Sequence, residues 1–405
     1  MLSFEDKIMS LCKKHFDKIL LLVFMLFSVY LRYKYTPLVN ITNGGSDYKS
    51  EILPWINYYK ENGIKNTLAS GVGDYYVPYN LIIGVISLFN VDPVYPLCIY
   101  SYFFEYLMAL YLYKIVLLLL NVEEGTNDSR YVKYVKCFTA FSLCLPMVIA
   151  NGAIWKQSDS VYSALICISL YYFLKKRYNL SFIWLGIAFS FKLQTILVIP
   201  FYLIAYFILR EFSIFEFAWI PVIYAIFGIP AIVCGQRFTH VYGTYFRQVG
   251  EYGAMTINTP GIYVLGLSEY MYHHVAMVIT IAILAFMMMW LSMEEKRLSK
   301  MSLLYLAGWC VMTCFEFLPQ MHERYDYIAI MILTFVAVFF RHKIIPAVIG
   351  MHLTSACTYG KFLFAFEVDY TLVAIVYLFA YCLITYDFIK CCDNSVENGY
   401  INDGT

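Results

Sequence analysis

Five short polar motifs interrupt an otherwise apolar sequence and contain most of the side chains that could do chemistry. They read GGSDYK at 44–49, GDY at 73–75, WKQSD at 155–159, FKLQ at 191–194 and PQMHERY at 319–325. Charged groups at the ends of apolar segments are costly unless they face a cavity or each other. We therefore treat these motifs as candidate parts of one functional site.

These residue types suit the transfer of a group from a lipid-linked phosphate to a hydroxyl. Asp47 is the predicted catalytic base for the acceptor hydroxyl, and Asp74 is the reserve candidate. Lys192, Arg324 and His322 are predicted to bind the donor phosphate and to stabilise the charge that develops on it. Because phosphate is already a good leaving group, a single base suffices, and direct displacement predicts inversion at the anomeric carbon.

The other side chains of these motifs are predicted to line the substrate pocket. They are Asp74, Tyr75, Trp155, Gln157, Asp159, Gln194 and Glu323. Individual residues of the five motifs also have simpler structural explanations: Lys192 could snorkel to the interface, Asp159 could cap a helix, and Glu323 could form an ion pair with Arg324. We expect Glu323 to orient the guanidinium of Arg324, and the occurrence of all five motifs at one membrane face favours a shared site.

A metal requirement is not expected. Asp47, Asp74 and Asp159 could in principle surround a divalent cation through their carboxylate oxygens. No closely spaced pair of aspartates accompanies them, however. We therefore expect that no cofactor is required, with a divalent metal as the less favoured alternative.

The composition is that of a multi-span integral membrane protein. Of the 405 residues, 61% are hydrophobic and 14% are charged, with a mean hydropathy of +0.64. A net charge of +1 argues against nucleic acid as a partner. The 12 cysteines lie mostly inside apolar runs, which is typical of small buried side chains and not of a disulfide framework.

The distribution of lysine and arginine predicts an all-α polytopic protein with about twelve membrane-spanning helices. The basic N-terminal residues 1–18 and the clusters KKR at 175–177, KRLSK at 296–300 and RHK at 341–343 all fall on one side if both termini are cytoplasmic. Residues 1–390 then form a single transmembrane domain. The polar tail 391–405 is predicted to be disordered and cytoplasmic.

Two loops are predicted on the extracytoplasmic face. The first, 39–95, contains apolar segments at 52–59 and 79–89 that are shorter than the ~20 residues a spanning helix needs. We interpret both as helices lying at the membrane interface. The second loop covers 235–263.

The ordered motifs resemble those of a known family. SDYKSEILPW, GDYYVPY, WKQSDSVY, AFSFKLQTILVIPF, NTPGIYVL and FLPQMHERYDY, spread over residues 46–327, are similar to motifs of the bacterial membrane mannosyltransferase-like proteins related to the GPI-anchor mannosyltransferases. These proteins belong to the GT-C class of polyprenyl-phosphate-sugar-dependent glycosyltransferases. Two positions depart from the pattern: Lys156 replaces the usual glycine of Trp-Gly-Gln, and Glu105 stands where an aspartate is expected.

The resemblance implies a GT-C-like fold and an inverting transfer outside the membrane, with Asp47 as the base. The donor would be mannose or another hexose on polyprenyl phosphate, and the acceptor a hydroxyl of an envelope glycan or a lipid-linked glycan. Asn258, in the motif NTPGIYVL, would join the substrate pocket. Compactness and composition suggest a bacterial plasma membrane.

Two other classes of protein share some of these features. A lipid-linked polysaccharide polymerase or flippase would have similar spans, loops and cations, but it would not need an aspartate early in the first outer loop. A secondary transporter would place charges near the midplane on discontinuous helices, whereas here the polar motifs lie at span ends. Membrane lipid is an expected partner in every case.

Overall fold

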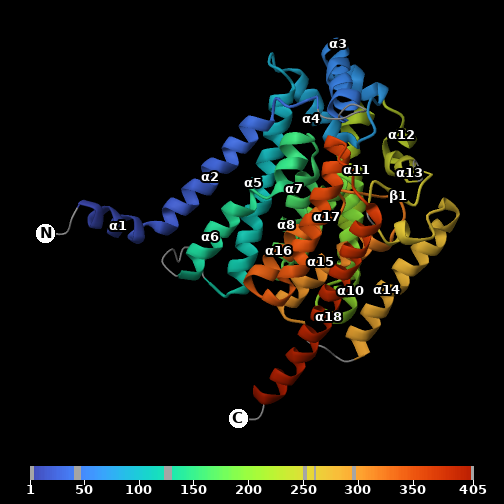
Figure 1. Cartoon of the computed structure of the whole chain (residues 1–405). Helices are drawn as coiled ribbons and strands as arrows, with labels where there is room; N and C mark the ends of the chain where they lie inside the picture. The colour runs from blue at the N-terminus through green and yellow to red at the C-terminus, as the bar shows by residue number, and fades with distance from the viewer. Residues whose placement is uncertain are drawn as a thin grey trace.

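The protein is almost entirely helical. The computed structural model describes residues 4–40, 47–122, 130–249, 253–259, 261–293 and 298–402. It is 80% helical, and within these ranges it contains eighteen α-helices and two short strands (Figure 1).

The first nine helices cover the N-terminal half of the chain. They are α1 (Phe4–Lys14), α2 (Phe16–Tyr35), α3 (Leu53–Ser70), α4 (Val77–Ser87), α5 (Val94–Leu119), α6 (Arg130–Ser142), α7 (Pro146–Ile149), α8 (Asp159–Leu174) and α9 (Tyr178–Phe191). There are also two π-helical turns: η1 (Tyr48–Ile52) precedes α3, and η2 (Ala150–Ile154) follows α7.

The remaining helices complete the bundle. They are α10 (Ile199–Leu209), α11 (Trp219–Val233), α12 (Phe238–Tyr242), α13 (Thr244–Gln248), α14 (His273–Met293), α15 (Lys300–Phe317), α16 (Tyr327–Phe339), α17 (Ile345–Phe364) and α18 (Tyr370–Asn402). The 3₁₀ segment η3 (Leu193–Val198) leads into α10. The strands β1 (Thr256–Ile257) and β2 (Met321–His322) pair in parallel.

The core of the bundle is formed by α8, α15 and α16. Nearly all of their side chains are buried, as expected for helices that are apolar on every side. In contrast, α2 and α14 expose many large apolar side chains, among them Leu22, Leu26, Val278, Ile281 and Phe286. These outer faces are suited to contact with lipid.

Within the described ranges, four helices are long and apolar enough to cross a membrane: Val94–Leu119, Ile214–Val233, Tyr270–Met293 and Tyr370–Asp393. A fifth crossing is possible if Arg130–Ser142 and Pro146–Ile154, which meet at 46°, form one bent span. This supports an all-α membrane protein but does not confirm the predicted count of about twelve spans. The physical reason is length, because several apolar helices, such as α8 and α9, have only 10–17 residues.

Local sequence explains where the bent span breaks. Pro146 begins α7, and a proline inside a helix would remove a backbone hydrogen bond and clash with the preceding turn. The chain therefore leaves α6 at Ser142 and restarts at Pro146. The following π-helical turn, η2, brings the chain to Trp155 at the start of the WKQSD motif.

The segments predicted to be interfacial are helical. The segment 52–59 lies in η1 and α3, and the segment 79–89 overlaps α4, which has 11 residues. Helices α3, α4, α12 and α13 lie together at one end of the molecule, away from α1 and the C-terminus (Figure 1). We refer to this as the α3–α4 end.

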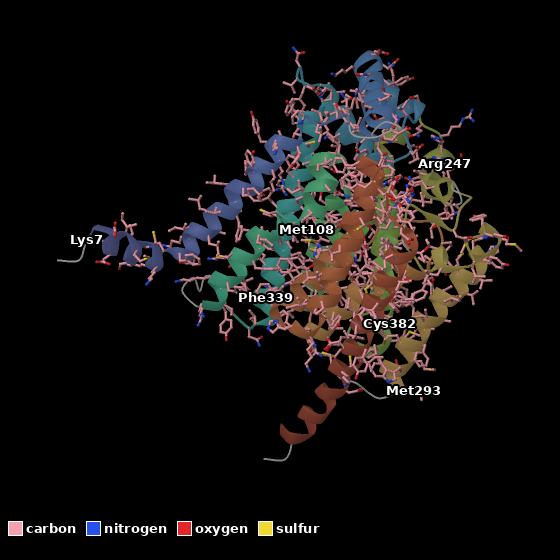
Figure 2. The ribbon with its side chains drawn as sticks, viewed as in Figure 1. Lys7, Met108, Arg247, Met293, Phe339 and Cys382 are labelled. Atoms are coloured by element: carbon pink, nitrogen blue, oxygen red, sulfur yellow. The ribbon has the colours of Figure 1, made fainter. Side chains whose placement is uncertain are left out.

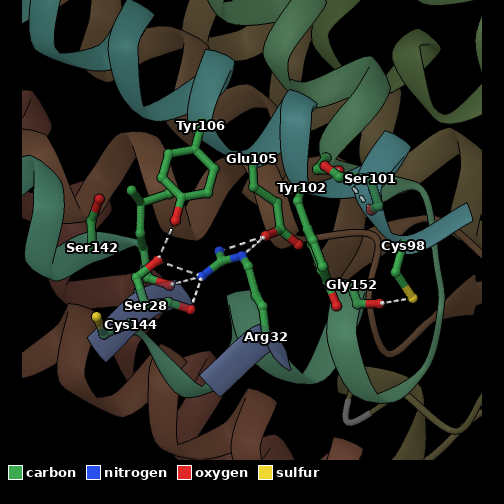
Figure 3. Close-up of polar contacts among 12 residues, drawn as sticks. Ser28, Arg32, Cys98, Ser101, Tyr102, Glu105, Tyr106, Ser142, Cys144 and Gly152 are labelled. Carbon is green, nitrogen blue, oxygen red and sulfur yellow. Dashed lines mark hydrogen bonds and ion pairs between the residues drawn. The ribbon is translucent and has the colours of Figure 1, made fainter. Parts of the chain in front are cut away.

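A buried ion pair joins α2 to α5. Nη2 of Arg32 lies 2.5 Å from Oε2 of Glu105, and Nε donates to the same oxygen at 2.8 Å. Ser28 accepts further hydrogen bonds from Arg32 through its hydroxyl and its carbonyl oxygen (Figure 3). Glu105 is thus the ion-pair partner of Arg32, and the pair joins α2 to α5.

Helix α18 is the longest described helix and is assigned from Tyr370 to Asn402. No proline interrupts the helix, and adding residues to an existing helix costs far less than nucleating a new one. The disorder of the polar tail 391–405 stays a prediction.

Candidate functional site

Asp47 lies at the start of η1 and is held by two side chains of the WKQSD motif. The indole Nε1 of Trp155 donates to Oδ2 of Asp47 at 3.2 Å, and the side-chain amide of Gln157 donates to the same oxygen. Among the described residues, no donor is bonded to Oδ1. One carboxylate oxygen is therefore fixed, and the other is oriented for an additional hydrogen bond.

Trp155 connects Asp47 to the cation of the MHERY motif. The guanidinium of Arg324 lies over the indole, with Cζ 4.7 Å from the ring centroid. The indole is fully buried and stacks on Phe362 of α17 at a centroid distance of 4.4 Å. A cation–π contact on the ring face and a hydrogen bond at the ring edge thus place the carboxylate and the guanidinium around one rigid side chain.

Asp159 brings together two of the predicted phosphate-binding cations. Lys192 forms a salt bridge with Oδ1 of Asp159, and Nε of Arg324 lies 3.5 Å from Oδ2. Asn151 of η2 donates to Oδ2 at 2.8 Å. The charge of Asp47 also acts on both Lys192 and Arg324, so we name Asp47, Trp155, Gln157, Asp159, Lys192, Glu323 and Arg324 the polar cluster.

Several buried polar atoms of the cluster and of Asn151 beside it form no hydrogen bond within the described part of the chain. They include Nε of Arg324, Oε2 of Glu323 and Oδ1 of Asn151. Leaving a buried polar group unpaired costs about 1–3 kcal/mol. Such atoms are typical of a site built to bind a polar ligand.

Glu323 pairs with Arg324 as predicted, since Nη1 donates to Oε1 at 3.2 Å. Burial raises the pKa of Glu323 to about 7, although Arg324 opposes the shift. Burial, together with Arg324 and Lys192, lowers the pKa of His322 to about 3. His322 is therefore neutral at physiological pH, and it could donate a hydrogen bond to phosphate but would add no positive charge.

Tyr75 and Asp74 lie at the rim of the cluster. The ammonium of Lys192 lies 6.0 Å from the ring centroid of Tyr75. Asp74 is exposed, and its backbone carbonyl oxygen accepts a hydrogen bond of 2.6 Å from Gln248 of α13. Burial and then the charges of Asp74 and Asp47 raise the pKa of Glu51, which places all three carboxylates near one another.

Two predicted pocket residues are less closely connected. Gln194 hydrogen-bonds to Tyr325 through its side chain. Asn258 is exposed and adopts a positive φ of 56° directly after β1. The strand pairing brings this loop beside His322, but no described contact joins the side chain of Asn258 to the polar cluster.

Lys156 points away from Asp47. Its ammonium donates to four carbonyl oxygens, including those of Leu38 at 2.5 Å, Ala153 at 2.8 Å and Ile154 at 2.9 Å. Burial lowers the pKa of Lys156 to about 8. Lys156 therefore ties η2 to the end of α2.

Sequence reasoning missed three residues that support the cluster. Asn151 bonds both Asp159 and, at 3.2 Å, the hydroxyl of Tyr359, and Phe362 stacks on Trp155. Asn151 stands eight residues before Asp159 in the same polar turn, so its polarity was a usable signal. Tyr359 and Phe362 lie in α17, some 200 residues away, and carried no local signal.

The cluster can therefore offer an oriented carboxylate, two cations and an aromatic face within one site. In the part of the chain that the structure describes, no group of three or more His, Cys, Asp or Glu side chains could hold a metal ion. The chain was also compared with known proteins. No protein-family model matches it, and no curated protein matches it either.

Proposed function

We propose that this protein is an integral-membrane inverting glycosyltransferase. It would move a hexose, with mannose as the first candidate, from a polyprenyl-phosphate donor to a hydroxyl of an envelope glycan or lipid-linked glycan. The observation that supports this best is the position of Trp155, which hydrogen-bonds the candidate base Asp47 and stacks on the candidate phosphate ligand Arg324. A base and a phosphate site must lie on opposite sides of a sugar carbon for in-line transfer.

In this reaction Asp47 accepts the proton of the acceptor hydroxyl through Oδ1 while Trp155 and Gln157 hold Oδ2. The acceptor oxygen attacks the anomeric carbon and forms the new glycosidic bond. The bond from that carbon to the phosphate oxygen breaks, and its electron pair remains on the polyprenyl phosphate. One displacement with one base inverts the anomeric configuration.

The phosphate would be bound by Lys192 and Arg324, which already share the carboxylate of Asp159. Arg324 offers a planar fork for two phosphate oxygens, and Lys192 offers a point charge. Nε of Arg324 lies 3.5 Å from Oδ2 of Asp159 and forms no hydrogen bond there, so it can turn to a ligand without breaking a strong bond. Asp159 would then hold both cations in position between turnovers.

The proposed location is a bacterial plasma membrane, with the polar cluster near the extracytoplasmic face and both termini in the cytoplasm. The supporting pattern is the distribution of lysine and arginine, which collects KKR, KRLSK and RHK on one side. The polyprenyl tail would remain in the lipid beside the helices.

The test is sugar transfer by the purified full-length protein in nanodiscs. The donor is radiolabelled mannosyl-phosphoryl-polyprenol, and the acceptor is a glycolipid extract from the envelope of the source cell. We expect labelled glycolipid with the anomeric configuration opposite to that of the donor, and loss of label incorporation in Asp47→Asn. No labelled glycolipid in nanodiscs, together with movement of a lipid-linked glycan across the bilayer of sealed proteoliposomes, would instead indicate a flippase and overturn the proposal.

A further inference from the structure

A basic cavity lies at the α3–α4 end, and none of its lining residues belongs to the polar cluster. Its volume is about 490 Å³, within the range of small-molecule sites. The polar side chains that line it come from the end of α3 and from the segment containing α12 and α13: Ser70, Gln236, Arg237, Thr239, His240 and Arg247. Figure 2 shows Arg247 at the edge of the molecule beside this end. We call this cavity the basic cup.

The described residues that line the cup carry charge of one sign. Arg237 and Arg247 are both exposed, and no acidic side chain is among these described lining residues. Within the described part of the chain, neither arginine forms a salt bridge. Neutral donors from Gln236 and Thr239 complete the lining, so the cup presents positive charge and hydrogen-bond donors to one space.

The walls of the cup are held in place by specific contacts. Gly71 ends α3 with a positive φ of 73°, and a side chain there would clash with Gln236 and His240. The side-chain amide of Gln236 lies 2.6 Å from Nδ1 of His240. Nη2 of Arg247 donates to the carbonyl oxygen of His240 at 2.9 Å and to the hydroxyl of Thr244 at 3.2 Å.

We propose that the basic cup binds a phosphate group, as a monoester or a diester. Two guanidinium groups supply paired donors with the geometry that phosphate oxygens accept, and the amide and hydroxyl side chains supply further donors. His240 adds support, because burial and the nearby Arg247 lower its pKa. A bound phosphate anion would reverse that shift by stabilising the imidazolium.

The cup is connected to the loop that carries Asp74 and Tyr75 by the backbone and by a hydrogen bond. Only two residues separate Gly71, at the cup, from Asp74, whose carbonyl oxygen is bound by Gln248 of α13. The site is inferred from the cup alone and does not depend on the proposed transferase activity. If that activity holds, a phosphate-bearing acceptor could be held here while its hydroxyl reaches the polar cluster.

The experiment measures phosphate binding by the full-length protein without any sugar donor. In the first arm, nanodiscs of phosphatidylcholine are titrated with inorganic phosphate and pyrophosphate by calorimetry, with the His240 imidazole followed by NMR. In the second arm, the retention of phosphatidylglycerol from an equal mixture with phosphatidylcholine is measured by native mass spectrometry. Binding in the first arm identifies a soluble phosphate, and binding in the second arm alone identifies a lipid headgroup.

We expect Arg237→Gln and the double variant R237Q/R247Q to weaken binding by about tenfold or more, and the His240 pKa to rise when the anion binds. The charge-matched control is R177Q/K343Q, since Arg177 and Lys343 are exposed and do not line the cup. Arg247 also bonds the end of α12, so the single variant Arg237→Gln keeps the test valid if the double variant misfolds. No binding in either arm, or equal binding by the wild type and Arg237→Gln, would overturn the inference.

Discussion

Arg324 has contacts that a lysine could not reproduce. Its guanidinium lies over the indole of Trp155, pairs with Glu323 through Nη1 and faces Asp159 through Nε. Lysine carries the same charge on a compact ammonium, which cannot form these three contacts in one plane. The roles of Arg324 and Lys192 in the cluster are therefore different even though they share one carboxylate.

From this we predict that Arg324→Lys loses most transfer activity, by about tenfold or more, and that Lys192→Ala loses donor affinity and turnover together. The measurement is donor binding and turnover for both single variants and the double variant. If the two residues share one phosphate, their effects are not additive. Arg341→Lys is the matched control, because it alters a bidentate arginine pair with Asp387 that includes no residue of the polar cluster. Small and additive losses would mean that the cluster is a structural ion network.

Glu323 should make stability depend on pH. Its pKa rises from 4.5 to about 7 on folding, so the folded protein binds the proton more tightly than the unfolded chain between these values. The free energy of unfolding therefore decreases as pH rises from about 4.5 to 7, by on the order of 3 kcal/mol from this group.

Glu323→Gln should accordingly flatten the pH dependence of the thermal denaturation midpoint over this interval, while retaining a hydrogen bond to Arg324. Glu211→Gln is the control, because Glu211 is paired with Lys176 at 2.8 Å and its pKa is lowered. That variant should leave the slope between about pH 5 and 7 unchanged. An unchanged slope in Glu323→Gln would contradict the raised pKa.

At the scale of elements, the position of the cluster depends on breaks in the helices. Trp155, Gln157 and Asp159 follow the π-helical turn η2, and Lys192 stands between α9 and η3. Each break lets a polar side chain leave a helix end and turn toward the same space. The polar motifs WKQSD and FKLQ marked where these breaks fall, whereas the π-helical turns themselves have no distinct sequence signal.

The ion pair between Arg32 and Glu105 should affect the stability of the protein mainly when only one of its two charges is removed. Arg32→Met would leave a buried carboxylate unpaired and should cost about 3–5 kcal/mol. The double variant R32M/E105M replaces both charges with apolar groups and should recover most of this loss. Thermal denaturation in one detergent compares the variants. If the double variant is instead less stable than Arg32→Met, the ion pair itself stabilises the contact between α2 and α5. The loss in Arg32→Met would then not come only from the unpaired, buried carboxylate of Glu105.

Part of the site could be predicted from the sequence and part could not. The motifs of Asp47, Lys192 and Arg324 stood out because charge is rare in this chain. The bond from Trp155 to Asp47 spans 108 residues, and no local pattern encodes which side chains meet over that separation. Lys156 shows the same limit, since nothing in the WKQSD motif indicates that its ammonium is bound by the carbonyl oxygens of Leu38, Ala153 and Ile154.

At the scale of the whole molecule, composition was enough to predict a helical membrane protein, and the helices bear this out. The number of crossings depends on how short and bent helices sit in lipid, which length and hydropathy alone do not decide. The two sides of the molecule can be distinguished by experiment. Asp74 and Phe246 are exposed at the α3–α4 end, and Lys176 and Lys343 are exposed on the predicted cytoplasmic side.

We predict that cysteines at Asp74 and Phe246 react with a membrane-impermeant reagent added outside cells, and that cysteines at Lys176 and Lys343 react only after permeabilisation. The exposed native residues Cys12, Cys357 and Cys382 are first replaced by serine. Labelling of all four positions from one side would contradict the predicted orientation.

The most direct test of the central claim is the turnover of Asp47→Asn with the polyprenyl-phosphate donor. Asparagine can still accept hydrogen bonds from Trp155 and Gln157, so the variant should fold and bind the donor with unchanged affinity. Because it cannot take the proton from the acceptor hydroxyl, turnover should fall by about a hundredfold or more. The paired control is Asp6→Asn, since Asp6 is exposed in α1 and belongs to neither the polar cluster nor the predicted pocket, and this variant should retain most of its activity. Near wild-type turnover in Asp47→Asn would contradict the assignment of Asp47 as the base.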